Sequence, residues 1–160
     1  MDNSIADLKK AIEIRNDRPS VYNNLGLSFF EKGDFEEALV HYGKAITAEQ
    51  SSVHYNNRGL AHYHINKQEE AKADFDMALD KDPHDSTIYF NRGNLFLNWE
   101  PQQRFEDAHK DYDTAVSIAP NNAKLWHSKG LAYQGEAEQI FQLTGKQDNQ
   151  DLNMKAISMF

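Results

Sequence analysis

Three asparagines recur along the chain in the same local pattern, Asn-X-Gly, at Asn24, Asn57 and Asn91. A primary amide both donates and accepts hydrogen bonds, so it matches the alternating N–H and C=O groups of an extended peptide. Asparagine is only a moderate helix former, so helix formation does not explain its recurrence. These residues therefore indicate recognition of a peptide backbone. The alternative is that each amide bonds only a neighbouring helix or water.

Residues that could do catalytic or metal chemistry do not form a recognisable pattern. The chain has 7 histidines, but no two stand four residues apart, the spacing that lets two metal ligands share one helix face. Phosphate-loop, zinc-protease, nucleophile-elbow and calcium-loop motifs are absent from the sequence. We therefore predict that the chain is not an enzyme, with no catalytic residue, no cofactor and no metal.

The composition is that of a folded, soluble and acidic chain. Its 160 residues are 39% hydrophobic and 26% charged, and 17 basic against 25 acidic side chains give a formal net charge of −8. Binding to nucleic acid or to an anionic membrane surface needs clustered Lys and Arg, so neither is expected as a partner. The sequence has no cysteine, no signal peptide and no apolar run of membrane-spanning length. We expect a cytoplasmic or nuclear location.

A repeat of about one helical hairpin organises the whole chain. Successive glycines stand 33, 34 and 37 residues apart, at Gly26, Gly59, Gly93 and Gly130. Within each unit, apolar residues recur at three- and four-residue spacing before and after a turn that interrupts the pattern. Each unit is therefore a helix A, a short turn and a helix B. Paired carboxylates open each helix B ("FEEA", "QEEA", "FEDA"), where negative charge suits the helix N-terminus.

This signature resembles the tetratricopeptide repeat. In family order the first full unit reads Tyr22, Leu25, Gly26, Phe29, Ala38, Tyr42, Ala45, and the next two units follow in phase. The resemblance implies an all-α fold, a right-handed superhelical solenoid of antiparallel helix pairs. The expected units are a half repeat at 1–18, full repeats at 19–51 and 52–85, a repeat with a short insertion at 86–122, and a truncated repeat with a long insertion at 123–160.

The chain departs from the family pattern at two kinds of position. Arg58, Arg92 and Lys129 stand where leucine is usual, and we expect their stems to pack while the charges reach water. Two insertions fall at 99–104 and 135–151. We expect the second to extend helix A to about Gly145, followed by a polar loop over "KQDNQD".

Both ends of the chain cut through a repeat. The first residues, "IADLKKAIEI", match a helix B, and the last, Ile157, Met159 and Phe160, are apolar where a capped array would be polar. We therefore expect a fragment of a longer protein. A homodimer through the truncated ends is possible in principle.

The resemblance also implies where a peptide would bind, because the A helices of such arrays line a concave groove. The predicted peptide-binding residues are Asn24, Leu27, Asn57, Leu60, Tyr63, His64, Phe90, Asn91, Asn94, Lys124 and His127. In an acidic chain with a nearly neutral groove, the expected partner is a neutral or basic protein segment with apolar anchors.

Some family members hold acidic chaperone C-termini with a carboxylate clamp of Lys and Asn, then Asn, then Lys and Arg, from three successive repeats. The matching positions here are Asn23 and Leu27, then Asn57, then Thr87 and Asn91. Only Asn57 fits in this register, and a start one repeat later keeps only Asn91 and Lys124. The clamp is largely absent, so we predict no chaperone clamp.

Two other functions stay open from the sequence. The array could be a structural spacer or self-association element of a larger assembly, which the apolar end favours. It could also select substrates for an enzyme whose catalytic domain lies outside these residues. The function favoured by the asparagines is a protein–protein interaction module, a scaffold or adaptor.

Overall fold

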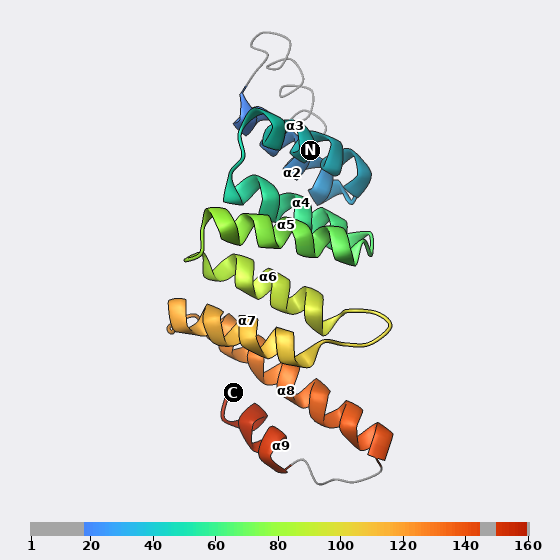
Figure 1. Cartoon of the computed structure of the whole chain (residues 1–160), viewed down its shortest axis with the longest axis vertical. Coiled ribbons are helices and arrows are strands. Elements are labelled where there is room, and N and C mark those ends of the chain that lie inside the picture. Colours follow the sequence, from blue (N-terminus) through green and yellow to red (C-terminus); the bar gives the residue numbers. More distant parts are fainter. Residues whose placement is uncertain (1–17, 145–149, 160) are drawn as a thin grey trace. The chain divides into compact units, whose positions relative to one another are not determined.

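The structure is a computed structural model that describes residues 18–144 and 150–159. Regular structure in these two ranges is helical throughout, with helices that pair in antiparallel fashion (Figure 1). The chain divides into two compact units, residues 1–83 and 84–160, each described here by itself. The expected all-α class and its antiparallel helix pairs are confirmed. The expected half repeat at 1–18 lies outside the described residues except for Arg18, and so does Phe160.

The first unit contains two helix pairs in its described part. They are α2 (Pro19–Lys32) with α3 (Phe35–Ala48), and α4 (Ser52–His64) with α5 (Gln68–Lys81). Helix α3 packs on α4, so the pairs stack, and α2 also contacts α4. The two A helices therefore lie next to each other in this unit.

Local sequence explains where these helices begin and end. Pro19 occupies the first helical turn of α2, where its missing N–H is not needed. Gly33 ends α2 in the left-handed region with φ 84°, and its N–H bonds the carbonyl groups of the preceding turn. The Ser51 side chain caps α4 by accepting from the His54 N–H. Paired acidic residues do occupy the first turns of α3 and α5, as predicted.

The repeated glycines allow an aromatic ring of helix B to lie against helix A. A Cβ on Gly26 would stand 2.6 Å from the Tyr42 ring, and a Cβ on Gly59 would stand 2.9 Å from the Phe75 ring. Both rings are almost completely buried, Tyr42 at 1% and Phe75 at 0% exposure. In both helix pairs of this unit, the repeated glycine thus allows the same contact between a ring and the backbone.

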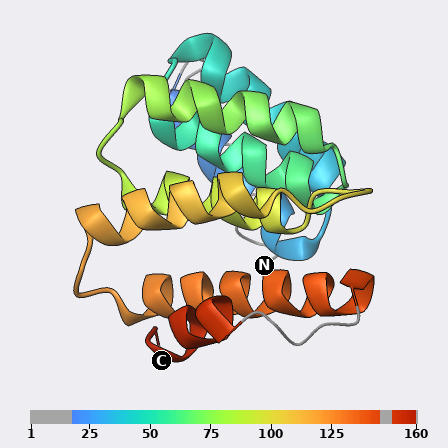
Figure 2. The ribbon, with the colours of Figure 1, turned by 60° about the horizontal axis from the view of Figure 1, so that its bottom comes forward.

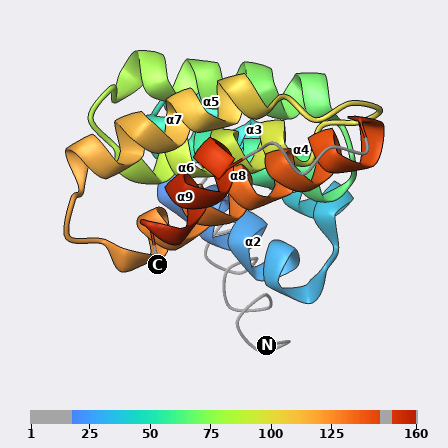
Figure 3. The same cartoon turned by 90° about the horizontal axis from the view of Figure 1, so that it is seen from below.

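The second unit contains the other two helix pairs. They are α6 (Ser86–Leu97) with α7 (Phe105–Ile118), and α8 (Ala123–Thr144) with α9 (Gln150–Ile157). Figure 2 shows α7 above α8, with α9 in front of α8 and much shorter than it. Seen from below in Figure 3, α9 runs back along α8 so that it ends near the beginning of α8. Gly93 again faces a ring, since a Cβ there would stand 3.0 Å from Tyr112.

The two predicted insertions meet in the second unit. Helix α8 extends to Thr144, which confirms the expected long helix A. The predicted polar loop is partly wrong, because α9 already begins at Gln150; residues 145–149 lie outside the described part of the chain. The Gln139 side chain, in the α8 extension, donates to Gln103 in the α6–α7 loop at 3.3 Å. None of the helices in the described ranges is long and apolar enough to cross a membrane.

Candidate functional site

Asn24 and Asn57, in the first unit, differ in exposure and in hydrogen bonding. Asn24 is exposed on α2. Asn57, on α4, donates from Nδ2 to Asn23 Oδ1 at 2.9 Å. One N–H of the Asn57 amide therefore bonds a neighbouring helix, which was the alternative to peptide recognition. The side-chain amide oxygen of Asn57, Oδ1, takes no part in that bond and can accept a hydrogen bond.

Apolar and aromatic side chains accompany these amides. Leu27 is 42% exposed, while Leu60 and Tyr63 are partly buried. His64 stacks on the Phe35 ring at 4.8 Å and meets the Phe30 ring edge-on at 5.1 Å. Burial raises the pKa of the Tyr63 hydroxyl above its ordinary value. The structure thus brings the predicted Tyr63 and His64 together in one aromatic cluster at the end of α4, with ring centroids 5.6 Å apart.

In the second unit, several predicted contact residues already have partners. Asn91 is partly buried on α6. Asn94 accepts a hydrogen bond from the buried Tyr112 hydroxyl at 2.6 Å. The Lys124 ammonium stands over the Phe90 ring, 4.7 Å from its centre. Asn94 and Phe90 therefore contribute to internal packing, which reduces what each can offer to a ligand.

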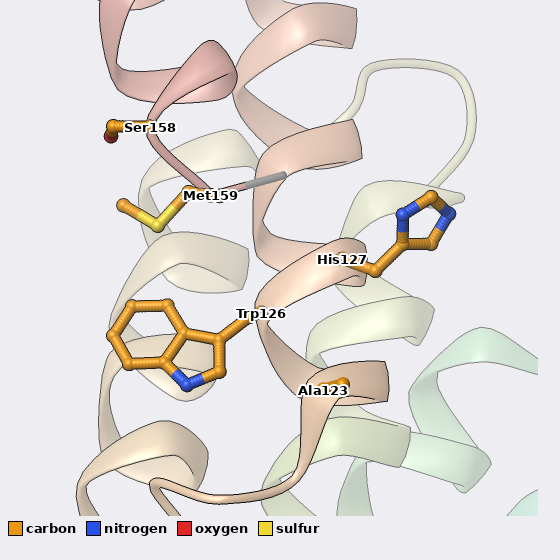
Figure 4. Close-up of a pocket in the computed structure, with 5 residues that line it drawn as sticks. All are labelled: Ala123, Trp126, His127, Ser158 and Met159. Atoms are coloured by element: carbon orange, nitrogen blue, oxygen red, sulfur yellow. The ribbon is translucent and has the colours of Figure 1, made fainter.

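His127 borders a pocket of about 560 Å³ between the first turn of α8 and the end of α9 (Figure 4). Trp126, its neighbour, donates from its indole nitrogen to the Pro120 carbonyl at 2.8 Å. Ser158 and Met159 form the opposite wall. The pocket lies within the second unit, and sequence reasoning named only His127 of its lining.

Carboxylates are distributed unequally between the A and B helices. The sequences of α4 (Ser52–His64) and α6 (Ser86–Leu97) contain no Asp or Glu, and α2 has only Glu31 in its last turn. Helices α3, α5 and α7 carry two, five and four carboxylates respectively. Among these six helices the net negative charge therefore lies on the B helices, and a ligand on α2, α4 or α6 would meet few carboxylates.

The arginines at leucine positions stay partly exposed, at 29% for Arg58 and 21% for Arg92, but their charges also pair with buried aspartates, which we did not predict. Arg58 forms a bidentate pair with Asp74 at 2.9 and 2.6 Å, and Arg92 pairs with Asp111 at 2.8 and 2.7 Å. Both aspartates are 3% exposed. His62 Nδ1 lies 3.0 Å from the same Asp74 carboxylate. Each aspartate is buried between helix A and helix B and pairs there with a partly exposed arginine.

A signal for these pairs exists within the sequence. Each aspartate stands three residues after the repeated alanine of helix B, at Ala71 and Ala108, and the first repeat has His41 there instead. The first repeat also has Leu25 where the other two have arginine. The two positions thus change together from repeat to repeat. Lys129, at the same position in the fourth repeat, does not follow this pattern. It is 9% exposed and pairs at 2.7 Å with Asp113 of α7, the helix B of the preceding repeat.

The Asp74 pair predicts a pH dependence of stability. Burial raises the pKa of the Asp74 carboxyl, but the hydrogen bonds from His62 and Arg58 and the coulombic effects of both groups together lower that pKa below its ordinary value. A lowered folded-state pKa stabilises the fold above the ordinary carboxyl range, and this stabilisation is lost as pH falls through the folded-state value. We expect the difference in urea midpoint between the wild type and Asp74→Asn to narrow between about pH 7 and about pH 3. A difference that stays constant over this range would contradict the assignment.

Within residues 18–144 and 150–159, no group of three or more His, Asp or Glu side chains is arranged to hold a metal ion. The arrangement offers hydrogen-bonding amides, exposed leucine and aromatic surface on the A helices.

Two family descriptions match the first part of the chain. The family description "Tetratricopeptide repeat" matches residues 19–51, and the description "TPR repeat" matches residues 1–33. Residues 1–51 are therefore similar to the tetratricopeptide repeat family. The first match spans α2 and α3, so the family signature coincides with one helix pair of the structure.

Two curated relatives are much longer than this chain. The DnaJ homolog subfamily C member 7 homolog of Dictyostelium discoideum is 29% identical, with 66% of this chain and 22% of the relative covered. RNA polymerase II-associated protein 3 of Homo sapiens is 27% identical, with 69% of this chain and 16% of the relative covered. The chain therefore spans less than a quarter of either relative.

Solved structures share the tetratricopeptide repeat fold. The crystal structure of MamA is 20% identical, with a TM-score of 0.75, 97% of this chain and 85% of that chain covered, which shows the fold alone. The first TPR of Spaghetti (RPAP3), bound to the HSP90 peptide SRMEEVD, is 25% identical with a TM-score of 0.68, and 74% of this chain and 93% of that chain are covered.

Proposed function

We propose that this chain is a protein-interaction module whose A helices hold an extended segment of a partner protein. The main observation behind the proposal is the register of Asn24, Asn57 and Asn91, which occupy the same position in three successive A helices. Each amide would donate to or accept from the backbone of the segment, independently of its side chains. The role is binding rather than catalysis.

Two features of the described residues support this proposal. Asn24 is exposed, and Asn57 keeps an acceptor oxygen outside its bond to Asn23. Leu27 adds exposed apolar surface one turn from Asn24. The related Spaghetti structure holds a peptide, which makes peptide recognition a reasonable use of the same fold.

The chemistry of the A helices favours a neutral or basic segment with apolar anchors. An acidic segment would approach a chain of net charge −8, and the arginines that could receive it are engaged with Asp74 and Asp111. Basic side chains of a partner would be attracted by the carboxylates of the B helices, an effect that weakens as salt increases. The clamp positions Leu27 and Thr87 carry no charge, so we propose that chaperone C-terminal tails are not ligands.

Affinity capture from a cell lysate tests the proposed function. We expect the wild-type chain to retain a partner that the triple variant Asn24→Ala, Asn57→Ala, Asn91→Ala loses, because three backbone hydrogen bonds of about 1 kcal/mol each disappear. A matched control replaces three exposed amides away from the asparagine register, Gln50, Gln102 and Gln142, by alanine. Helicity measured by circular dichroism should be unchanged in both variants. Equal capture by all three proteins would contradict a role for the asparagines.

The relatives leave a second possibility for the whole protein. Because the chain covers less than a quarter of two curated relatives, the module can serve a larger polypeptide, including an enzyme whose substrates it selects. The binding proposal for the A helices is the same in either case.

A further inference from the structure

The loop between α6 and α7 and the extension of α8 enclose a polar pocket in the second unit. Both segments are insertions relative to the first two repeats, at 99–104 and 135–151. In Figure 3 the loop and the far end of α8 lie at the same side of the unit. The pocket has a volume of about 260 Å³, and its lining consists of Asn98, Trp99, Glu100, Pro101, Gln103 and Gln139. None of these residues belongs to the binding surface expected on the A helices.

Hydrogen bonds between side chains and backbone hold two walls of this pocket in place. The Gln139 amide donates from Nε2 to Gln103 Oε1 at 3.3 Å, which joins the α8 extension to the loop. The Asn98 amide donates from Nδ2 to the Asn94 carbonyl at 2.8 Å. Both bonds use amide N–H groups, and the oxygen of a primary amide accepts hydrogen bonds separately. The two walls therefore offer acceptors to a ligand.

The third polar wall carries a negative charge. Glu100 is exposed in the loop, so a ligand can reach it from solvent. A carboxylate only accepts hydrogen bonds, and its two oxygens have room for the paired N–H groups of one guanidinium. The ligand that fits this lining is therefore a hydrogen-bond donor with positive charge.

Trp99 supplies apolar surface beside these acceptors, and its ring is held from within the unit. The Arg104 guanidinium stands over the Trp99 ring, 4.9 Å from its centre, and the Phe96 ring lies 5.9 Å away. Arg104 also pairs with Asp107 at 2.6 Å, which offsets its charge. The indole is thus a fixed wall against which the aliphatic part of a ligand can pack.

The charge and the size of the site both restrict its ligand. Residues 98–107 and 136–139 together contain five carboxylates and one arginine, so their field attracts a cation. The volume is below the roughly 300–1,000 Å³ that sites for drug-sized molecules have, which suits a single side chain. An acidic or neutral side chain would leave the Glu100 carboxylate without a counterion.

We propose that this pocket receives an arginine side chain of a partner protein. The guanidinium forms a bidentate pair with Glu100, the amide oxygens of Asn98 and Gln139 accept from its other N–H groups, and its stem packs on Trp99. Lysine fits less well, because its ammonium is a compact charge with three donors and no planar fork. The inference rests on the proposed function in that the guest belongs to a partner protein, but it uses none of the three asparagines of the A helices.

Nuclear magnetic resonance titration of the full chain with single-residue probes tests this pocket. The probes are Nα-acetyl-arginine amide and the matching citrulline amide, which has nearly the same shape without the charge. We expect saturable shifts of the Trp99 indole N–H and the Gln139 side-chain amide, with a dissociation constant on the order of millimolar for arginine. Citrulline should bind at least about tenfold more weakly, because it lacks the charge-assisted bonds to Glu100.

Matched variants locate the site and separate it from the asparagines. Glu100→Gln should weaken arginine binding about tenfold, whereas Glu138→Gln, an equal change in charge at an exposed α8 residue outside the lining, should alter it by less than about twofold. The triple variant Asn24→Ala, Asn57→Ala, Asn91→Ala should bind the arginine probe as the wild type does, so loss of the proposed A-helix function would leave this result unchanged. Absence of saturable shifts, equal binding of arginine and citrulline, or equal effects of the two glutamine variants overturns the proposal.

Discussion

Replacing Asp74 by alanine should lower the free energy of unfolding by about 3 kcal/mol, because removal of one partner leaves a buried charge without its counterion. The Arg58 guanidinium makes two hydrogen bonds to this carboxylate, and His62 makes a third. Arg58 keeps 29% of its side chain exposed, which allows partial hydration and places the loss at the lower end of the usual range. Urea unfolding followed by circular dichroism measures the change.

Two further variants test whether the loss in Asp74→Ala comes from breaking the ion pair with Arg58. Asp80→Ala removes a carboxylate of the same helix that is 70% exposed, and it should change stability by less than about 0.5 kcal/mol. The triple variant Arg58→Leu, His62→Phe, Asp74→His installs the residues that the first repeat has at these positions, Leu25, Phe29 and His41. We expect it to recover most of the loss, since Phe29 and His41 stack with ring centres 5.3 Å apart. An Asp74→Ala chain as stable as Asp80→Ala would show that the pair contributes little.

Replacing Gly26 by alanine should cost about 3 kcal/mol, the upper end for overpacking of a well-filled core. The added Cβ would stand 2.6 Å from two atoms of the Tyr42 ring, closer than two carbon atoms can approach. Tyr42 is 1% exposed and cannot move away without disturbing its own cluster with Ala38 and Ala61.

Gly43, on α3 in the same unit, provides a control in which the change to alanine should raise the free energy of unfolding. A Cβ at Gly43 has no neighbour within 4 Å, and the residue lies inside a helix. Gly43→Ala should therefore stabilise the chain by about 0.5 to 1 kcal/mol, because alanine loses less conformational entropy in a helix. Thermal unfolding of both variants gives the comparison. If Gly26→Ala were also neutral or stabilising, the close ring contact would be wrong.

The contacts that repeat in every unit could be predicted from the sequence alone. The period of Gly26, Gly59 and Gly93 predicted helix pairs in close contact, and the structure adds the aromatic ring that each glycine faces. The long helix A to Thr144 was predicted in the same way, because its apolar residues continue the helical period.

The polar contacts could not be predicted from the helical period. The pairing of Arg58 with Asp74 depends on which face of helix B meets helix A, and that face becomes evident only when the repeats are compared position by position. The bond from Tyr112 to Asn94 joins a core ring to a residue expected to face a ligand. Such bonds depend on the length and direction of side chains on two facing helices, which cannot be predicted from the spacing of residue types.

Calorimetric titration of the captured segment into the chain tests the central proposal most directly, because it measures the asparagine contribution apart from partner side chains. We predict that the triple asparagine variant binds the segment about 100-fold more weakly than the wild type, since three bonds contribute about 3 kcal/mol. The same loss should appear for a segment whose non-anchor side chains are all alanine, because the amides contact only its backbone. Equal affinity of the wild type and the triple variant for the segment would contradict the proposal.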